Sequence, residues 1–441
     1  MLPLESWTLG ESSGITQGAI WQYSCLSRAN ITSLNRSANS YTMTVKVPQM
    51  WHKLPVNLTE LCIDTTLRCG QSFRWRKFGD EWRCTLHGRI LSLRQDPECV
   101  RYKATWPTHR PEVNKQCQAD DTEALLRHYF NLDVDLGSLY KQWSDVDPNF
   151  RKKAPTFTGV RILNQDAWEA LVAFICSSNN NISRISQMVH KLCIHYGPLL
   201  GHIDTEAFHD FPEPAALTGK GVEAHLRELG FGYRAKYIAD TARMVAHDKP
   251  SGWLESLRNP ESPAFGGASS DQDLQAAYKQ AHDELLTLKG VGPKVADCVC
   301  LMGLGWGESV PVDTHVWQIA QRDYKFGKKS KTFNKVMYDA VGDHFRVLWG
   351  KYAGWAHSVL FTADLKQFAE QAAVKGEDAT AVQVKEETIE SNGVTTKRKR
   401  VTTVKAEVKT EVKVEDAEDA EGLALALPIK RRRTRQTRSG G

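Results

Sequence analysis

The sequence predicts an α+β protein in which a small antiparallel β-sheet domain packs on a larger helical domain and a charged tail follows. Three features of the chain support this fold class. Between about residues 50 and 118 apolar and polar residues alternate with the period of strands, and after about residue 120 apolar residues recur at helical spacing. Beyond about residue 370 aromatic residues are absent, so that part cannot build a core.

The composition suits two or three domains and no membrane span. The 441 residues are 41% hydrophobic and include 13 Trp, but no apolar run reaches the roughly 18 residues that cross a bilayer. The ten cysteines form no CxxC pair and no metal-ligand spacing, so we predict a reduced intracellular protein with no metal and no cofactor. The net charge of +5 weakly favours an acidic partner.

The elements follow in order from these periods. Residues 1–48 are polar and carry few basic residues, so we predict an irregular lead-in, with a degenerate transit peptide as the alternative. Residues 50–150 are the predicted sheet domain. Within it, "EWRCTLHGRILSLRQ" (81–95) alternates on both sides of His87 and Gly88, which predicts a hairpin.

Residues 155–370 are predicted to form the helical domain, and residues 371–441 a disordered charged tail. A loop rich in Pro, Gly and Ser is expected at 258–272. Helices are expected at 165–178, 182–196, 234–247, 275–288, 293–304, 315–322, 332–346 and 352–369.

The stretch "LKGVGPKVADC" (288–298) separates two of these helices. In one interpretation its glycines end the first helix and its proline starts the second, which is ordinary helix punctuation. In the other it is a helix–hairpin–helix, in which the backbone amides of Gly290, Val291 and Gly292 approach a phosphate. Such a hairpin binds the backbone of a nucleic acid and reads no base sequence.

Lys294 and Asp313 are the candidate catalytic residues. A helix N-terminus disfavours the ammonium of Lys294 by about 0.3–1 kcal/mol, too little alone to make the amine a nucleophile at neutral pH. Desolvation in a closed pocket would supply the rest, whereas an exposed Lys294 would be a solvated surface residue. Asp313 in "VPVDTHVW" (310–317) suits an N-cap and equally a carboxylate that stabilises positive charge on a sugar.

These two stretches resemble the signature of the helix–hairpin–helix DNA glycosylases. Other stretches resemble one family among them, the eukaryotic 8-oxoguanine DNA glycosylase/AP lyases, in the family's order over about residues 50–370. The resemblance implies an antiparallel sheet domain packed on a helix–hairpin–helix glycosylase domain. It also implies an enzyme that removes 8-oxoguanine opposite cytosine and then acts as a lyase. The stretches are "CGQSFRW" (69–75), "GVRILNQDAWEALVAFICSSNNNISRI" (159–185), "LGFGYRAKYI" (229–238), "KVADCVCLMGLG" (294–305) and "AGWAHSVLFTADL" (353–365).

The related endonuclease III carries an iron–sulfur cluster held by four cysteines after its catalytic domain. In this chain no cysteine follows Cys300. The sequence therefore argues against that branch of the superfamily.

The resemblance implies a role for each matching residue of a base pocket. Lys294 matches the lysine that attacks the sugar C1′ and forms a Schiff base, and Asp313 matches the aspartate that stabilises the oxocarbenium-like charge. The damaged nucleotide must be flipped out of the duplex to reach them. Gly70 matches the glycine whose carbonyl accepts the N7–H that 8-oxoguanine has and guanine lacks. Cys298 and Phe361 match the residues that sandwich the base.

A second set of residues matches the family's contacts to the rest of the duplex. Asn179, Arg184 and Arg234 match the groups that hold the orphaned cytosine, whose acceptor edge suits arginine donors. Tyr233 matches the aromatic wedge that fills the vacated stack, and His315 matches a histidine near the DNA phosphate. A solvated surface position is the alternative for either arginine.

The sequence departs from the family's pattern at His357, where glutamine is usual. Neutral histidine also offers one donor and one acceptor, but on a shorter and rigid ring. We therefore expect retained recognition of 8-oxoguanine with altered discrimination, or a pH dependence between about 6 and 7. Pro293 replaces a frequent threonine and should be harmless at a first helical position.

The tail predicts partners and a compartment. "KRKR" (397–400) and "IKRRRTRQTR" (429–438) indicate a signal for a nuclear import receptor or a DNA-binding arm, with a solvated charge run as the alternative. Five Val-Lys-x-Glu repeats between 374 and 415 resemble acceptor sites for SUMO conjugation. We expect a nuclear monomer that binds double-stranded DNA containing 8-oxoguanine, with the mitochondrion as a second compartment.

Two other functions stay open at this point. One is a glycosylase for another oxidised or alkylated base, because the shape of the pocket decides the substrate. The other is a non-catalytic DNA-damage binding module, against which the presence of both Lys294 and Asp313 counts.

Overall fold

The computed structural model describes residues 50–107, 120–266, 277–327, 333–365 and 368, and the backbone of 386–391 and 394–399. The predicted lead-in and most of the predicted tail lie outside these ranges. The chain divides into two units, Met1–Ala369 and Glu370–Gly441, and the first contains both the five-stranded sheet and the helices.

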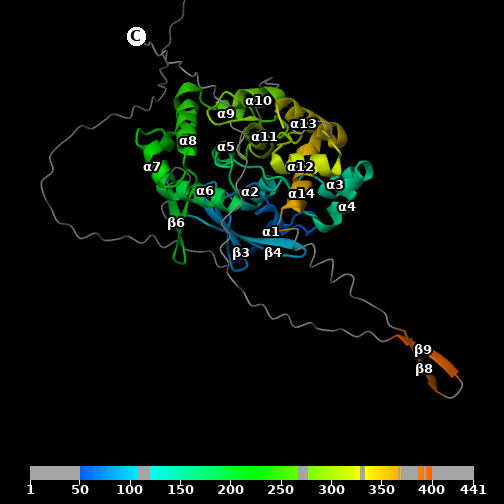
Figure 1. The fold of residues 1–441 in the computed structure, drawn as a ribbon. Helices are drawn as coiled ribbons and strands as arrows, with labels where there is room; N and C mark the ends of the chain where they lie inside the picture. The colour runs from blue at the N-terminus through cyan, green and yellow to red at the C-terminus, as the bar shows by residue number, and fades with distance from the viewer. Residues whose placement is uncertain are drawn as a thin grey trace, which may run out of the picture. The chain divides into compact units, whose positions relative to one another are not determined.

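The predicted sheet is confirmed as one five-stranded antiparallel sheet with the order β1-β5-β4-β3-β2, blue to cyan in Figure 1. A short helix, α1 (Ile63–Thr66), follows the first strand. The strands are β1 (His52–Pro55), β2 (Arg76–Phe78), β3 (Glu81–Leu86), β4 (Arg89–Asp96) and β5 (Cys99–Thr105).

The hairpin predicted at His87 and Gly88 joins β3 to β4. Both residues have positive φ, 48° and 70°. This is the geometry of the two-residue turns whose twist matches that of the flanking strands. The alternation of the sequence and the turn chemistry therefore agree on one register, in which Leu86 pairs with Arg89.

The predicted helical domain is also confirmed, and each predicted helix is found with ends that shift by a few residues. Of the loop predicted at 258–272, residues 258–266 contain no helix, and residues 267–272 lie outside the described part of the chain. No described helix is long and apolar enough to cross a membrane. The elements are α2 (Thr122–Tyr129), α3 (Leu136–Val146), α4 (Pro148–Lys153), α5 (Ala167–Ile175), α6 (Ile182–Tyr196), β6 (Leu199–Ile203), β7 (Glu206–His209), α7 (Val222–Glu228), α8 (Arg234–Arg243), α9 (Trp253–Ser256), α10 (Tyr278–Leu285), α11 (Pro293–Met302), α12 (Thr314–Asp323), α13 (Lys335–Trp349) and α14 (Ala353–Asp364).

The core of the sheet ends before the predicted boundary at residue 150. Leu126 of α2 and Phe130 after it pack with the strands in one core cluster. Trp143 of α3 and Phe150 of α4 are fully buried in the larger core of the helical domain instead. Helices α3 and α4 therefore pack with the helical domain, although the sequence grouped them with the sheet.

The hairpin β6–β7 was not predicted from the sequence. Phe208 and Ile203 of this hairpin form a small cluster with Ile90 of β4, so they cover the sheet on the side away from α2. Strands of four or five residues, one of them with a register shift between Leu199 and Gly201, carry little periodic signal, and contact with a distant strand supplies their stability.

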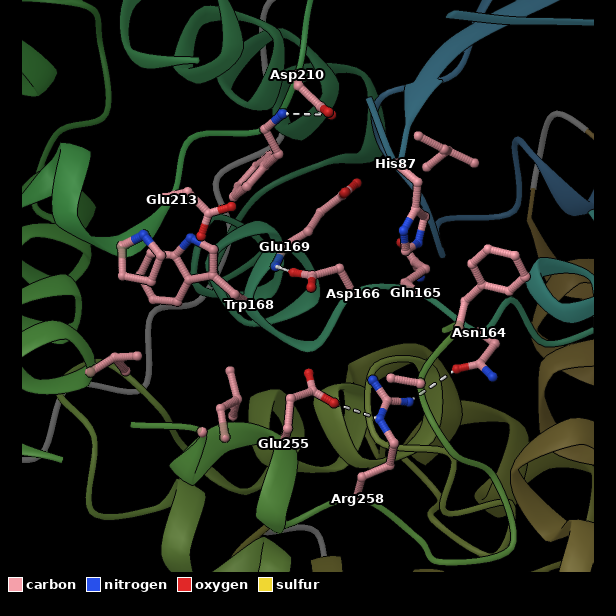
Figure 2. A pocket seen from close by; sticks show the side chains of 18 of the residues that line it. His87, Asn164, Gln165, Asp166, Trp168, Glu169, Asp210, Glu213, Glu255 and Arg258 are labelled. Carbon is pink, nitrogen blue, oxygen red and sulfur yellow. Dashed lines mark hydrogen bonds and ion pairs between the residues drawn. The ribbon is translucent and has the colours of Figure 1, made fainter. Parts of the chain in front are cut away.

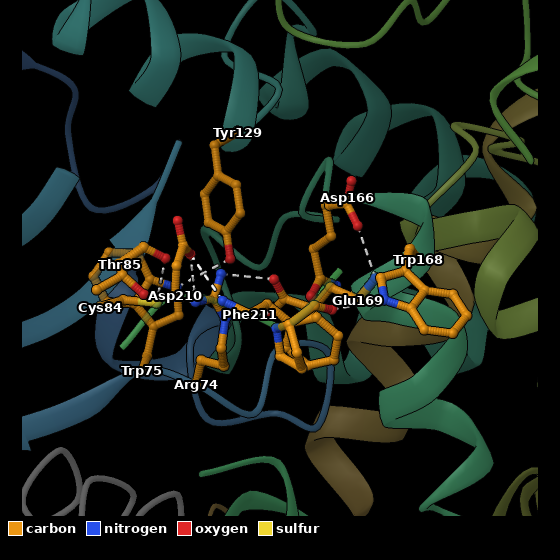
Figure 3. A network of polar contacts seen from close by, with 12 residues as sticks. Arg74, Trp75, Cys84, Thr85, Tyr129, Asp166, Trp168, Glu169, Asp210 and Phe211 are labelled. Atoms are coloured by element: carbon orange, nitrogen blue, oxygen red, sulfur yellow. Dashed lines mark hydrogen bonds and ion pairs between the residues drawn. The ribbon is translucent and has the colours of Figure 1, made fainter. Parts of the chain in front are cut away.

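A buried ion-pair network joins the sheet to the helical domain (Figure 3). Arg74 donates to both carboxylate oxygens of Glu169 on α5, at 2.9 and 2.7 Å, and to Asp210 at 3.1 Å. It also donates to the hydroxyl of Thr85 on β3 at 2.6 Å. Burial raises the pKa of Glu169 more than the guanidinium lowers it. The network fixes α5, which carries part of the site described below, against the sheet.

The second unit contains one described hairpin, in which β8 (Glu386–Ser391) pairs antiparallel with β9 (Val394–Lys399). An isolated two-stranded hairpin is at most marginally stable in water. The rest of the predicted tail lies outside the described residues.

Candidate active site

All the predicted catalytic and base-pocket residues line one small cavity of about 50 Å³. They come from the loop before β2, from α11, from the start of α12 and from α14. The volume is below the roughly 300–1,000 Å³ of typical ligand pockets, so a purine can enter only when lining side chains move. The residues are Lys294, Asp313, Gly70, Cys298, His357 and Phe361.

Lys294 occupies the first turn of α11, directly after Pro293 at the first helical position. Its amine donates to Ser177 Oγ at 3.1 Å and lies 5.1 Å from the centre of the Phe174 ring. The side chain is half-buried and faces the cavity. The interpretation of Lys294 as a solvated surface residue is therefore wrong.

Asp313 is both the N-cap of α12 and a carboxylate of the cavity wall, as the sequence allowed. Its Oδ1 accepts from the backbone N–H of Val316 at 2.9 Å, which caps α12, and the same side chain lines the cavity. His315, two residues on, is exposed, and its ring centre lies 6.2 Å from that of Phe361 at the cavity. The start of α12 therefore presents a carboxylate inward and an imidazole outward.

Gly70 lies in a loop that is tied to the helical domain. Its φ is +88°, and a Cβ at this position would lie 3.1 Å from Cδ1 of Ile182. The side chain of Gln71 donates to the carbonyl of Arg161 at 2.7 Å and accepts from the N–H of Leu163 at 2.9 Å. The backbone at Gly70 is thus held in a left-handed conformation that favours glycine.

Cys298 lies one turn after Lys294 on α11 and is 3% exposed. Burial raises the pKa of its thiol to about 11, and the nearby Lys294 offsets this only in part. The thiol is therefore neutral at physiological pH, where it acts as a small polarisable surface rather than a nucleophile.

His357 and Phe361 lie one turn apart on α14, so they share a face of the helix. Neither ring nitrogen of His357 has a hydrogen-bond partner among the described residues, although the side chain is buried. Burial lowers the pKa of His357 to about 4, against the attraction of Asp313 and with the repulsion of Lys294. The ring is neutral between pH 6 and 7, so the predicted pH dependence in that window is wrong for the free protein.

The depressed pKa of His357 predicts a loss of stability in acid. Between the folded pKa of about 4 and the usual value of 6.5, the unfolded chain binds a proton that the folded protein does not. The free energy of unfolding should therefore fall as the pH drops through this window, by on the order of 3 kcal/mol at pH 4. Urea unfolding from pH 4 to 7 measures it, with His357→Gln as the control. Equal slopes for both proteins would contradict the assignment.

The predicted contacts to the opposite strand divide into exposed and buried groups. Asn179 and Arg184 are exposed, and Tyr233 is 47% exposed at the start of α8. Tyr233 donates its hydroxyl to the carbonyl of Ser178 at 3.0 Å. Arg234 is only 3% exposed, and its guanidinium donates to the carbonyls of Ser178 and Asn179. The solvated alternative is wrong for Arg234, which in the free protein holds the loop that carries Asn179.

The stretch 290–292 forms the predicted hairpin between α10 and α11. Gly290 has φ +77°, and a Cβ there would overlap the ring of Tyr237 on α8. Thr241 of α8 donates its hydroxyl to the carbonyl of Lys289 at 2.8 Å. The hairpin is therefore fixed to α8, whose start carries Tyr233 and Arg234. This agrees with the expectation that the hairpin and these two residues contact the same nucleic acid.

A larger cavity, of about 640 Å³, contains none of the predicted site residues (Figure 2). Its basic side chains are paired, as in the contact of Arg258 with Glu255 at 2.8 Å. Concentrated negative charge repels DNA phosphates, so size does not identify the DNA-binding site in this protein. The carboxylates of its wall are Asp166, Glu169, Asp210, Glu213 and Glu255.

The sequence did not single out Phe174 and Ser177 as site residues. Phe174 belongs to the apolar stripe of α5, whose period also fits an ordinary core residue. Ser177 precedes Lys294 by 117 residues, and only the folded chain brings its hydroxyl to the amine.

Comparison with known proteins agrees with this geometry. Two family models match in succession: the 8-oxoguanine DNA glycosylase N-terminal domain over residues 53–171 and the HhH-GPD superfamily base excision DNA repair protein over 172–340. An N-glycosylase/DNA lyase of Saccharomyces cerevisiae is 39% identical over 71% of this chain and 86% of its own length. The N-glycosylase/DNA lyase OGG1 of Arabidopsis thaliana is 37% identical over 71% of this chain and 80% of its own length.

A solved structure of the Clostridium acetobutylicum 8-oxoguanine glycosylase/lyase in its apo form resembles this one with a TM-score of 0.56. It is 25% identical and covers 71% of this chain and 98% of its own. The two family models match in the expected order, and both curated relatives align with 71% of this chain. These matches confirm the resemblance seen in the motifs. The chain therefore belongs to the 8-oxoguanine DNA glycosylase family of N-glycosylase/DNA lyases.

Proposed function

We propose that this protein removes 8-oxoguanine opposite cytosine from duplex DNA and then cleaves the strand at the abasic site. The observation that carries the proposal is the convergence of an amine, a carboxylate and a set of stacking and polar groups on one cavity. The curated relatives are named N-glycosylase/DNA lyase, which fits an amine nucleophile.

The chemistry starts once the damaged nucleotide has been flipped out of the duplex. The lone pair of the Lys294 amine attacks C1′ of the sugar as the bond from C1′ to N9 breaks. The base leaves with the electron pair and takes up a proton. Asp313 stabilises the positive charge that develops on the sugar. The attached amine then passes a proton to the ring oxygen as the bond between C1′ and that oxygen breaks, which leaves a protonated imine at C1′. Removal of a C2′ proton then expels the 3′ phosphate.

Discrimination between damaged and normal guanine rests on one hydrogen at N7. The carbonyl of Gly70 accepts the N7–H of 8-oxoguanine, whereas guanine presents a lone pair there and leaves the carbonyl unpaired. An unmatched buried polar group costs about 1–3 kcal/mol, so a rigid Gly70 loop is a sufficient discriminator. The two bonds from Gln71 supply that rigidity.

The polar edge of the flipped base would meet His357. Because the ring nitrogens of His357 have no protein partner and the ring is neutral, it offers one donor and one acceptor to the base. Cys298 and Phe361 supply the apolar surfaces for its two faces. The opposite cytosine would be held by Asn179 and Arg184, and by Arg234 after it releases a loop carbonyl.

Borohydride trapping tests the proposal directly, because the reagent reduces an imine to a stable amine. The substrate is a duplex with one 8-oxoguanine opposite cytosine, and the controls are Lys294→Gln and an undamaged duplex. We expect a covalent complex only for wild type with the damaged duplex. Intact binding without a complex would move the assignment to a damage-binding module or, if another lesion is trapped, to a different damaged base.

The tail supports a further proposal about partners and compartment. The basic runs at 397–400 and 429–438 suit an import receptor, and the Val-Lys-x-Glu repeats suit SUMO conjugation. We propose a monomer that acts chiefly in the nucleus, with a mitochondrial share. Imaging of the full chain beside a chain that ends at residue 370 tests this. Equal nuclear accumulation would contradict the role of the tail.

A further inference from the structure

A buried carboxylate next to the active site collects three hydroxyl donors. Asp297 on α11 is 2% exposed and lies three residues after Lys294. It accepts hydrogen bonds from the hydroxyls of Tyr278 on α10, Tyr338 on α13 and Ser309, the last at 2.9 Å. A buried carboxylate is tolerated only when its oxygens are satisfied, and here three elements supply the donors.

The two tyrosines of this network differ in their second contact. The hydroxyl of Tyr338 also accepts from the backbone N–H of Val312 at 3.4 Å, and Val312 directly precedes Asp313. The hydroxyl of Tyr278 instead accepts from the guanidinium of Arg346 at 3.5 Å. Val312 is 1% exposed, so water cannot replace Tyr338 as the partner of its N–H.

We infer that Tyr338, anchored by Asp297, is a positioning residue that fixes Asp313 relative to Lys294. Asp297 shares a rigid helix with Lys294, and Tyr338 links that carboxylate to the backbone that presents Asp313. Ser309 attaches the same segment a second time, because its hydroxyl lies 2.9 Å from both the carboxylate and the carbonyl of Asp297. The inference rests on the proposed function, in which Lys294 and Asp313 perform the chemistry.

The matched pair Tyr338→Phe and Tyr278→Phe tests the inference. Each variant removes one hydroxyl from the same carboxylate, but among the described residues only the hydroxyl of Tyr338 accepts a hydrogen bond from the backbone of Val312, the residue before Asp313. We expect Tyr338→Phe to lower the single-turnover rate of 8-oxoguanine excision by about 10- to 100-fold, since displacing a reacting group by 1 Å can cost on the order of 100-fold. Tyr278→Phe should stay within about threefold of wild type, and both should bind the damaged duplex as wild type does.

A second measurement separates positioning from general loss of structure. In an Asp313→Asn background, Tyr338→Phe should have almost no further effect on the rate, because the group that it positions has lost its charge. Equal losses for the two tyrosine variants, or an undiminished effect of Tyr338→Phe in that background, would overturn the inference. Failure of wild type to excise 8-oxoguanine would instead overturn the proposed function.

Discussion

Asp313→Asn is expected to slow excision of 8-oxoguanine by about 10²- to 10³-fold, the usual cost of removing one group that stabilises transition-state charge. Asparagine caps helices as well as aspartate does, so the hydrogen bond to the N–H of Val316 should survive. The free energy of unfolding should therefore stay within about 1 kcal/mol of wild type. The small decrease comes from the loss of a negative charge at a helix N-terminus.

Single-turnover excision and urea unfolding of the same preparation measure the two effects. Asp313→Ala is the control, because it removes both the charge and the cap and should lose activity and about 1 kcal/mol of stability together. If Asp313→Asn excised the base at the wild-type rate, Asp313 would have no catalytic role and would only cap the helix.

Arg74→Met is expected to lower the free energy of unfolding by about 3–5 kcal/mol, because it leaves the carboxylate of Glu169 buried without its partner. Both side chains are 7% exposed, so the pair is screened little by water. Arg74 also donates to Asp210 and to the hydroxyl of Thr85, so its loss removes these two hydrogen bonds as well.

Denaturant unfolding of Arg74→Met beside the double variant Arg74→Met/Glu169→Gln checks the cause. The second substitution removes the uncompensated charge, so the double variant should recover part of the lost stability. If Glu169→Gln instead lowered the free energy of unfolding of Arg74→Met further, burial of an unpaired charge would not be the cause.

The alternation of residues and the turn residues were enough to predict the elements whose conformation depends on neighbouring residues in the chain. The alternation around His87 and Gly88 specified the hairpin because both the strand period and the turn residues pointed to it. The glycines and proline before Lys294 specified the hairpin and the start of α11 in the same way, because few residues adopt the backbone that this turn needs.

The base pocket was predicted by resemblance, and its assembly depended on contacts between distant segments. Gly70 and His357 are separated by most of the chain, yet both line the cavity that holds Lys294. Periodicity carries no information about such pairs, because it reports which face of an element is buried and not what lies against it.

The sequence by itself determined the fold class, and its residue types and local spacing singled out the turn at 290–292 and the catalytic candidates Lys294 and Asp313. Only the tertiary structure decided that α3 and α4 pack with the helical domain and that Arg234 turns inward onto the carbonyl of Asn179. It also decided that His357 is neutral near pH 7, which moves its titration below the pH window expected from its residue type. The reason is common to all three: burial and long-range pairing set the energy of a side chain, and both depend on segments far away in the sequence.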